Sequence, residues 1–345
     1  RTFGSLHPNY DTWTTKVTKL AKKGSVLLSV RAPVGEVNIA DKDVCIGRGL
    51  MSIDGKNNKF IFYLFRGFKN YVVNKETGTV YGSVTRGDIA KLKFPFPNDT
   101  EQSAIAKILS DLDSKIELNQ QMNKTLEAIG QAIFKRWFVD FEFPNEKGKP
   151  YKSSGGEMVD SELGEIPKGW LVGKYEDLVN ISTGKGLKRE DFSEKGKYAV
   201  LGANGELGRT NNFLFDESLI LTGRVGTLGT VYLIRGKYWI SDNVLISKPK
   251  SEENYYYSYF IIKLFDFRSL NRGSTQPLIT QTDIKNQIVL IPDNTTLLQF
   301  HKICLSMFDK IYQNGLENVG LSQIRDSLLP RLMSGKIRVP VEVRA

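Results

Sequence analysis

The sequence has very few of the residues that build metal sites or disulfide frameworks. Only two cysteines, Cys45 and Cys304, and two histidines, His7 and His301, occur in 345 residues. Because no Cys-x-x-Cys or His-x-x-x-His pair is present, we expect no structural zinc site and no other bound metal. Two cysteines in opposite halves of the chain cannot form a disulfide framework, which favours a reducing, cytoplasmic location.

Other absences exclude whole classes of protein. No apolar run approaches the roughly 18 to 20 residues that a membrane span needs, and the N-terminus does not have the pattern of a signal peptide. No Gly-x-x-x-x-Gly-Lys-Ser/Thr loop occurs, so nucleotide hydrolysis through a P-loop is not expected. Neither histidine lies in a recognisable catalytic setting, so a Ser-His-Asp triad is not expected either.

The charge balance indicates the class of partner. Lys and Arg number 48 against 38 Asp and Glu, which gives a formal net charge of +10. A positive balance favours a polyanionic partner, most simply nucleic acid. The 40% of hydrophobic and 25% of charged residues are ordinary for folded proteins. The length predicts two or three domains.

An internal duplication is the most informative feature of the sequence. Residues 25–39 and 218–233 both have a strand-like apolar run, an arginine, a turn containing glycine and a second apolar run. The offset begins at 218 − 25 = 193, becomes 239 − 45 = 194 and then 283 − 88 = 195, where it stays through Arg136 and Arg331. So small a drift over the length of the repeat indicates duplication rather than chance.

Each repeat begins with short, strand-like runs and ends in a long helix. Asp99 with Gln102, and Thr296 with Gln299, have the spacing of a helix N-cap. Apolar residues then recur at steps of four and three, which favours a coiled-coil seam, although ordinary helix packing fits the spacing equally well. The seam positions are Ile105, Leu109, Leu112, Ile116, Asn119, Asn123, Leu126, Gly130, Ile133 and Trp137 in the first helix, and Phe300, Cys304, Met307, Ile311, Asn314, Asn318, Leu321, Leu328 and Leu332 in the second.

These patterns predict an α+β fold with a pseudo-two-fold internal repeat. Two mixed α/β globular units are joined by two long antiparallel coiled-coil helices. Asn119 and Asn314 fall at matching seam positions, where we expect them to face each other and fix the helix register. Residues 143–163 have the composition of a linker. Subtracting the offset from Gly164, where the second unit opens, gives 164 − 194 = −30, so about thirty residues of the first unit are expected to precede Arg1.

Several motifs, taken in order, resemble the specificity subunit of type I restriction-modification enzymes over essentially the whole chain. They are Gly-Glu-Ile-Pro-Lys-Gly-Trp at 164–170, Gly-Arg-Val-Gly-Thr-Leu-Gly at 223–229, Gly-Ser-Thr-Gln-Pro-Leu-Ile at 273–279, the Ile-Pro exit before the second helix, and Leu-Leu-Pro-Arg-Leu-Met-Ser-Gly-Lys-Ile at 328–337. The first repeat departs from the pattern. Its turn at 31–35 is one residue shorter, and residues 82–85 lack the Gln-Pro pair.

The resemblance implies a division of labour. Such a subunit carries two target-recognition domains joined by helical spacers, binds double-stranded DNA, and assembles with two methyltransferase subunits and with restriction subunits. The resemblance thus implies residues 1–98 as the first recognition domain, without its N-terminal part, 99–142 as the first spacer, 143–163 as the linker, 164–292 as the second recognition domain and 293–345 as the second spacer.

The chemistry is expected in the partner subunits. The chain lacks the Asn/Asp-Pro-Pro-Tyr/Phe motif of amino-methyltransferases, so we expect it to be non-catalytic and to bind no cofactor. S-adenosylmethionine, ATP and Mg²⁺ would then bind to the partners. Two alternatives stay open: the chain is the specificity region of a single-chain or two-subunit restriction-modification enzyme, or it is a scaffold whose charge is incidental.

Basic and polar residues in glycine-containing loops are the candidate DNA contacts. Arg31 and Arg224 follow strand-like runs at matching positions and enter a turn, a setting suited to a phosphate or a guanine edge, although a solvated turn is the alternative. The basic loop at 184–189 suits phosphate contact. The full set of candidates is Arg31, Arg86, Lys185, Lys188, Arg189, Arg209, Arg224, Thr227, Arg272, Thr275 and Gln276.

Aromatic residues form two further groups. The run Tyr255–Phe260 could stack on unpaired bases, but packing into a core is the stronger interpretation. Trp137 and Phe138, together with Arg331, are candidates for docking a partner protein, and burial against the chain's own globular unit is the alternative for the two aromatics.

Overall fold

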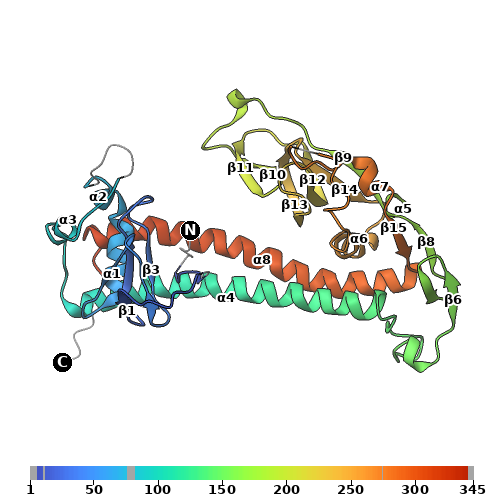
Figure 1. Cartoon of the computed structure of the whole chain (residues 1–345), viewed down its shortest axis with the longest axis horizontal. Coiled ribbons are helices and arrows are strands. Elements are labelled where there is room, and N and C mark those ends of the chain that lie inside the picture. The colour runs from blue at the N-terminus through green and yellow to red at the C-terminus, as the bar shows by residue number, and fades with distance from the viewer. Residues whose placement is uncertain (1–5, 11, 76–81, 274, 341–345) are drawn as a thin grey trace. The chain divides into compact units, whose positions relative to one another are not determined.

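Two forty-residue helices, α4 (Asp99–Phe138) and α8 (Asn294–Met333), are shared between two compact units. The computed structural model describes residues 6–10, 12–75, 82–273 and 275–340. Unit 1 comprises residues 1–123 and 312–345, and unit 2 comprises residues 124–311. Within each unit one half of α4 lies beside one half of α8 (Figure 1).

Unit 1 packs a small sheet and a helix on its part of the helix pair. Strands β2 (Val26–Ser29), β3 (Val37–Ile39) and β5 (Leu50–Ile53) form an antiparallel sheet in the order β3-β2-β5. Helix α1 (Asn58–Gly67) buries an aromatic-rich face between this sheet and the two long helices. The remaining elements are β1 (Leu20–Ala21), paired with β4 (Val44–Cys45), and helices α2 (Lys69–Val73) and α3 (Arg86–Ala90).

Unit 2 is built on a six-stranded mixed sheet in the order β11-β10-β13-β12-β14-β9. All neighbours in this sheet are antiparallel except β10 and β13. Its strands are β9 (Val179–Thr183), β10 (Tyr198–Gly202), β11 (Gly205–Thr210), β12 (Phe215–Gly223), β13 (Val231–Ile240) and β14 (Val244–Pro249). Around it lie β6 (Met158–Ser161), β7 (Gly164–Pro167), β8 (Leu171–Lys174), β15 (Ile288–Ile291), α5 (Tyr175–Leu178), α6 (Asn254–Ile262), α7 (Gln281–Lys285) and the short 3-10 turns Lys152–Ser154 and Arg189–Asp191.

The long helices pair antiparallel, as the sequence predicted. In unit 1 the contacting pairs are Asp113 with Arg325, Asn119 with Asn318, and Asn123 with Asn314. The sums of the paired numbers are 438, 437 and 437, and a nearly constant sum marks antiparallel pairing. The helix caps differ from the expected ones. The side chain of Asn98, not of Asp99, accepts from the backbone of the first turn of α4, and Asp293 does the same before α8.

The two seam asparagines do not face each other. Asn119 donates to Asn318 Oδ1 at 2.9 Å and to Glu317 at 2.8 Å, while Asn314 donates to Asn123 Oδ1 at 2.8 Å. Adding 195 to 119 and 123 gives 314 and 318, so the repeat exchanges the two pairs. The expected position was wrong by one helical turn, because the pairing sum of 437 and the offset of 195 place the centre of the antiparallel pair at (437 − 195)/2 = 121, midway between Asn119 and Asn123. The four residues, called here the asparagine cluster, still form a polar centre in the seam.

Backbone hydrogen bonds give a better alignment of the repeats than the sequence does. Ser29 N donates to Glu36 O, and Gly223 N donates to Thr230 O. Val30 N donates to Gly49 O, and Arg224 N donates to Asn243 O. The offset is therefore 223 − 29 = 194 and 224 − 30 = 194 already in the first strand, not 193. Arg224 is thus equivalent to Val30, and Arg31 is equivalent to Val225.

Residues 143–163, which have the composition of a linker, are folded against the rest of unit 2. Phe143 is buried and stacks on Trp170 with ring centroids 4.9 Å apart, and Tyr151 stacks on Phe143 at 4.5 Å. Strand β6 pairs with β7. The glycines and lysines that suggest a linker occupy turns, whereas the two aromatic residues anchor the segment.

Two residues expected to dock a partner protein belong to the core of unit 2. Trp137 and Phe138 are only 6% and 5% exposed. Phe138 contacts Tyr257 and Phe300 with centroid distances of 4.7 and 4.9 Å. Unit 2 buries Tyr256, Tyr257, Tyr259 and Phe260 on α6, so core packing, not base stacking, accounts for this aromatic run. The docking role proposed for Trp137 and Phe138 is therefore corrected to core packing, because unit 2 uses the end of α4 as one wall of its core.

Replacing Trp137 by Ala tests this burial. A large aromatic side chain removed from a closed core lowers the free energy of unfolding by about 3–5 kcal/mol. The control is Trp13→Ala, because Trp13 is 89% exposed and its removal is expected to change stability by no more than about 0.5 kcal/mol. Urea unfolding of both variants measures the difference, and equal effects would contradict a core role for Trp137.

Candidate nucleic-acid interface

Five loops of unit 2 meet at one end of its six-stranded sheet and are called here the loop cluster. They are residues 184–188 after β9, 203–204 after β10, 224–229 after β12, 241–243 between β13 and β14, and, before α7, the described residues 271–273 and 275–279. The ladder sets this arrangement, because Gly223 pairs with Val244, Leu245 with Thr183, and Leu201 with Ile240. Loops at one edge of a rigid sheet are suited to binding.

The turn at 224–229 and the loop at 271–279 hold each other. Val225 forms an isolated bridge with Leu278. Gly226 N donates to Pro277 O at 3.0 Å, and Ile279 N donates to Arg224 O at 2.9 Å. Gly226 and Gly229 have φ values of +73° and +75°, a region in which other residues are strained. The two motifs that the sequence separates by about fifty residues therefore form one surface.

A carboxylate fixes the base of the loop at 271–279. Arg272 Nε donates to Asp283 Oδ1 at 2.6 Å, and the carboxylate also accepts from the backbone and hydroxyl of Thr280 at 2.9 and 2.6 Å. Burial acts to raise the pKa of Asp283, but the hydrogen bonds from Arg272 and Thr280 outweigh it and hold that pKa below its usual range. Arg272, a candidate DNA contact, is thus engaged within unit 2.

Arg209 is likewise engaged within unit 2. Its Nε and one terminal nitrogen donate to the carbonyl oxygens of Gly196 and Lys197 at 2.7 and 2.9 Å, and the other terminal nitrogen lies 3.2 Å from Glu206. A guanidinium with all three nitrogens occupied acts as a clamp on the turn before β10. These contacts give Arg209 a structural role, and its contact with DNA stays a prediction.

Arg224 has a buried side-chain donor that no described residue satisfies. Its backbone belongs to the ladder, and its Nε is buried without a hydrogen-bond partner among the described residues. A buried guanidinium nitrogen without an acceptor is costly, so a DNA phosphate or base edge that supplies one would be favoured. Thr227 and Gln276 are exposed beside it. The hydroxyl of Thr227 accepts from Asn204 at 3.0 Å, and a Cβ built on Gly226 lies 3.9 Å from Gln276 Nε2.

The basic loop at 184–188 joins the same cluster. Lys185 N donates to Ile240 O at 2.8 Å, and Trp239 Nε1 donates to Lys185 O at 2.8 Å. The backbone is therefore held while the Lys185 side chain is exposed. Lys188 is also exposed and lies 3.5 Å from Glu190, and Arg189 and Thr275 are exposed.

Unit 1 has the same backbone frame with different side chains. Val84 N donates to Val30 O at 3.0 Å, as Ile279 N does to Arg224 O, and Arg31 forms an isolated bridge with Ser83 as Val225 does with Leu278. Arg31 is exposed and occupies the place of Val225, so it is not the counterpart of Arg224 as the sequence suggested. Arg86 is exposed on the first turn of α3, which has the same capping box as α7.

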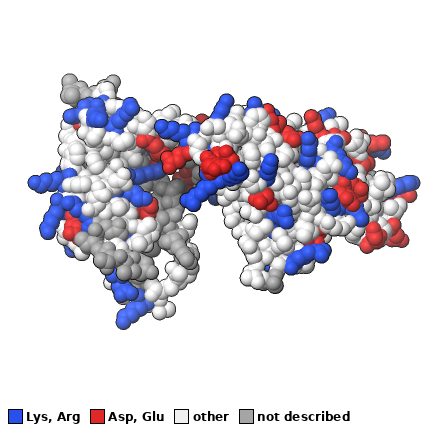
Figure 2. All heavy atoms as spheres, turned by 90° about the horizontal axis from the view of Figure 1, so that it is seen from above, with Lys and Arg blue, Asp and Glu red and all other residues white. Residues whose placement is uncertain are grey.

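The surface charge is mixed rather than segregated. Figure 2 shows Lys and Arg side chains interspersed with Asp and Glu on the face that it draws. The formal charge of +10 therefore does not form a single continuous basic patch on this face. Specific contacts from loops, more than a broad field, would have to position a nucleic acid there.

Three asparagines of the loop cluster were not anticipated from the sequence. Asn204 donates to Thr227, Asn243 accepts from the backbone of Arg224, and Asn271 Oδ1 accepts from Gly273 and Leu278 at 3.0 and 2.9 Å. The sequence feature that could have revealed these asparagines is the Gly/Asn composition of their loops. That composition predicts a turn, but it does not predict which other loop the turn contacts.

Of the candidates on the long helices, Arg331 is exposed near the end of α8. Within the described ranges, no helix is both long enough and apolar enough to cross a membrane.

The sequence of the chain was compared with protein families and with known proteins. The profile described as "Type I restriction modification DNA specificity domain" matches residues 9–128 and 167–323. The MjaIX specificity subunit of a type I restriction enzyme from Methanocaldococcus jannaschii is 28% identical, over 93% of this chain and 79% of that protein. The HindI specificity subunit from Haemophilus influenzae is 24% identical, over 92% of this chain and 88% of that protein.

A solved structure shares the fold. The crystal structure of a type I restriction-modification S subunit from M. genitalium superposes with a TM-score of 0.60 at 20% identity, covering 96% of this chain and 90% of that one.

The pH dependence of stability tests the contacts of Asp283. Because the folded pKa of Asp283 lies below the unfolded value near 3.9, its stabilising contribution is complete above about pH 4 and is lost as the pH falls through the folded pKa. The stability gap between the wild type and Asp283→Asn should be widest at neutral pH and narrow below about pH 4, as measured by urea unfolding. Arg272→Gln should show part of the same change. A gap independent of pH would contradict the assignment.

Proposed function

Because the chain belongs to the family of type I restriction-modification DNA specificity domains, we propose that it reads a bipartite, asymmetric DNA target for a complex of methyltransferase and restriction subunits. The carrying observation is that one backbone frame occurs twice with different loop side chains. Arg224 in unit 2 has Val30 as its equivalent in unit 1, so the two units present different chemistry to DNA.

The spacer between the two readings would be the helix pair. Two linked readers on double-stranded DNA recognise half-sites whose separation the protein sets. Different readers imply different half-sites, and the asparagine cluster fixes the helix register on which that separation depends. Loops would supply base contacts through Arg224, Thr227 and Gln276, and phosphate contacts through Lys185, Lys188 and Arg189.

The partner surface is proposed on exposed isoleucines that the repeat carries twice. Ile108 and Ile324 in unit 1 correspond to Ile303 and Ile129 in unit 2, since 108 + 195 = 303 and 129 + 195 = 324. All four are exposed on the long helices, by 37% to 51%. An apolar feature repeated on each unit fits two copies of one partner, here the methyltransferase subunit. Restriction subunits would join that assembly.

The chemistry is assigned to the partners. In this proposal the chain recognises DNA without catalysing a reaction, S-adenosylmethionine binds to the methyltransferase subunits, and ATP and Mg²⁺ serve the other subunits. The position of Arg331, exposed near the end of α8, is compatible with a contact to one of these subunits.

A map of methylated adenines in the host genome, with and without the gene, tests the function directly. Loss of a split, asymmetric motif on deletion would support the proposal and would give both half-sites and the gap. An unchanged map with intact partner genes would contradict it. A scaffold would leave methylation unchanged, and a reading frame longer by several hundred residues would favour a single-chain enzyme.

Arg224→Gln separates base reading from general DNA binding. We expect the assembled complex to lose about 1–3 kcal/mol of affinity for the mapped target, with weaker discrimination against a single changed base pair in one half-site. Lys185→Gln should weaken binding to target and non-target DNA alike, because phosphate contact carries no sequence information. Fluorescence anisotropy at fixed salt measures both variants.

Lys168→Gln is the matched control for lost charge, since Lys168 pairs with Glu157 away from the loop cluster. It should bind as the wild type does. If all three variants weakened binding equally, net charge rather than the loop cluster would account for affinity.

Removing the repeated isoleucines should remove methyltransferase subunits one at a time. Ile108→Asp with Ile324→Asp, or Ile303→Asp with Ile129→Asp, should each leave one bound subunit, and the quadruple variant none, because a buried unpaired charge opposes docking. Leu118→Asp is the control: Leu118 is 53% exposed, but its repeat equivalent is Gln313. Native mass spectrometry counts the subunits. Two bound subunits in the quadruple variant would refute this surface.

A further inference from the structure

The duplication allows more than one helix pairing, because α4 and α8 have similar seams and each could pair with the same helix of a second chain. Each residue of α8 occupies the same repeat position as the α4 residue whose number is lower by 195. The two α4 helices of two chains could therefore pair as α4 pairs with α8, and so could two α8 helices. The asparagine cluster does not oppose this, because Asn119 would meet Asn123 of a second copy just as it meets Asn318.

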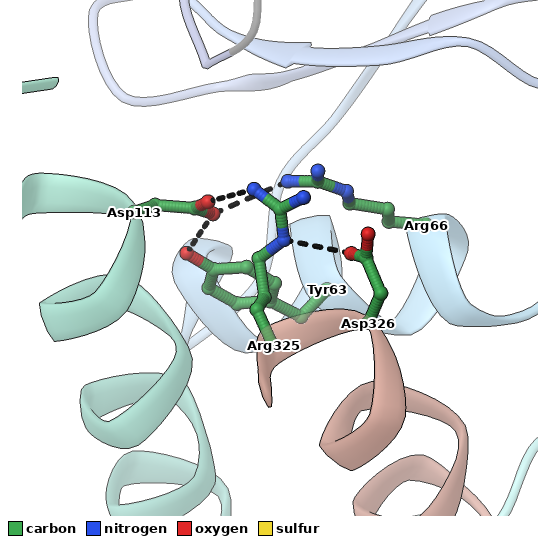
Figure 3. Close-up of polar contacts among 5 residues, drawn as sticks. All are labelled: Tyr63, Arg66, Asp113, Arg325 and Asp326. Atoms are coloured by element: carbon green, nitrogen blue, oxygen red, sulfur yellow. Dashed lines mark hydrogen bonds and ion pairs between the residues drawn. The ribbon is translucent and has the colours of Figure 1, made fainter. Parts of the chain in front are cut away.

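One position of the seam differs sharply between the repeats. In unit 1, Asp113 on α4 accepts from Arg325 on α8 at 2.6 Å (Figure 3). The same carboxylate accepts from the hydroxyl of Tyr63 at 2.8 Å and from Arg66 at 3.2 Å, both on α1. Asp113 is 9% exposed and the Arg325 side chain 12% exposed, so this is a nearly buried ionic contact.

The equivalent place in unit 2 is apolar. Adding 195 to 113 gives Phe308, and subtracting 195 from 325 gives Gly130. A Cβ built on Gly130 would lie 3.6 Å from Phe308 and only 2.9 Å from Phe260, so the absence of a side chain makes room for the two rings. Phe308 also stacks on Tyr256 with centroids 4.9 Å apart. The other seam positions keep their chemistry, with Ile105 replaced by Phe300, Leu109 by Cys304 and Leu112 by Met307.

We infer that this exchange of a charged pair for an aromatic–glycine pair makes α4 select an α8 helix over a second α4, and so excludes α4–α4 and α8–α8 pairing between two copies of the chain. In an α4–α4 pair Asp113 would face Gly130 of the second copy, because 325 − 195 = 130. In an α8–α8 pair Arg325 would face Phe308, because 113 + 195 = 308.

Each wrong pairing takes a buried charge away from its partner on the other long helix. Asp113 would keep Tyr63 and Arg66 but lose Arg325, and Arg325 would keep Asp326 but lose Asp113. A buried ionic group that loses its partner is strongly destabilising, whereas the matched pair roughly balances its own cost. An α4–α4 pair would separate Asp113 from Arg325 twice, and an α8–α8 pair would also press the long Arg325 side chain against a ring where glycine stands in the correct pair. The division of roles is clear: the asparagine cluster fixes register, and the pairs at 113/325 and 130/308 fix the partner.

The test is the full chain carrying Asp113→Leu with Arg325→Met. Apolar side chains of similar volume commonly replace a buried ion pair without loss of folding. Wild type and variant are unfolded in urea, refolded over a series of protein concentrations, and analysed by size-exclusion chromatography with light scattering. We expect the dimer fraction of the variant to exceed that of the wild type by at least about tenfold, because the loss of the buried Asp113–Arg325 ion pair no longer opposes self-pairing.

A domain-swapped dimer does not confuse this comparison. Swapping α8 between two chains keeps Asp113 facing Arg325 and Gly130 facing Phe308, so it is equally accessible to both proteins. A difference between them therefore reports self-pairing.

The matched control is Glu127→Leu with Lys263→Met. Glu127 on α4 accepts from Lys263 at 2.7 Å and from the Tyr259 hydroxyl at 2.6 Å. Tyr259 lies on α6 and Lys263 directly follows that helix, so neither partner is on α8. Its removal deletes a charged contact of α4 without changing the pairing of the long helices, although its side chains are more exposed, Glu127 by 42% and Lys263 by 31%. The control should dimerise no more than the wild type.

Equal dimer fractions in the variant and the wild type would overturn the inference, and so would an equal rise in the control, because any loss of stability would then cause association. Asp113→Asn with Arg325→Gln provides a second variant that keeps polar groups and much of the shape. If the first variant shows no cooperative unfolding, the same comparison and the same criteria apply to the second.

Discussion

The antiparallel pairing of α4 and α8 is the constraint on which both globular units depend. The core of unit 1 includes Ile105 and Leu109 from α4 with Leu329 and Leu332 from α8. The core of unit 2 includes Trp137 from α4 with Phe300 and Cys304 from α8. A slip of the helices by one turn would therefore open two cores at once. The asparagine cluster opposes such a slip, because the slip would leave the buried amide nitrogens of Asn119 and Asn314 without their acceptors.

Periodicity and duplication made the architecture predictable, whereas contacts between distant segments were beyond the sequence. The four-and-three spacing gives the two helices, and the repeat gives the antiparallel pseudo-two-fold arrangement. The prediction that Asn119 and Asn314 face each other was wrong, because the spacing of seam residues indicates which residues lie between the helices but not which of them contact each other. The caps at Asn98 and Asp293 were missed by one and three residues for a related reason, since several polar residues adjoin each helix start.

In the candidate interface, too, loops could be predicted from the sequence, but contacts between distant segments could not. Glycine-containing turns and basic loops could be found in the sequence, and the structure brings those at 184, 224 and 276 to one end of a sheet. The engagement of Arg209 and Arg272 could not be found, because each depends on acceptors that the fold places beside it. A one-residue error in aligning the first strands was also undetectable by residue type, since both repeats place an arginine near the turn. Only the hydrogen-bond ladder shows that Arg224 corresponds to Val30.

The features that the two repeats share and the features in which they differ serve different functions. Features that must be equal stay equal: the backbone frame of the turns, the capping boxes at Thr85 and Thr280, the asparagine cluster and the exposed isoleucines on the helices. Features that must differ have diverged: the side chains of the loops proposed to contact DNA, and the seam position where Asp113 and Arg325 replace an aromatic–glycine pair. Equality in the first set fits identical partners on each unit. Divergence in the second would give the proposed two DNA readings and one permitted helix pairing, so that a duplicated chain acts as a single asymmetric molecule.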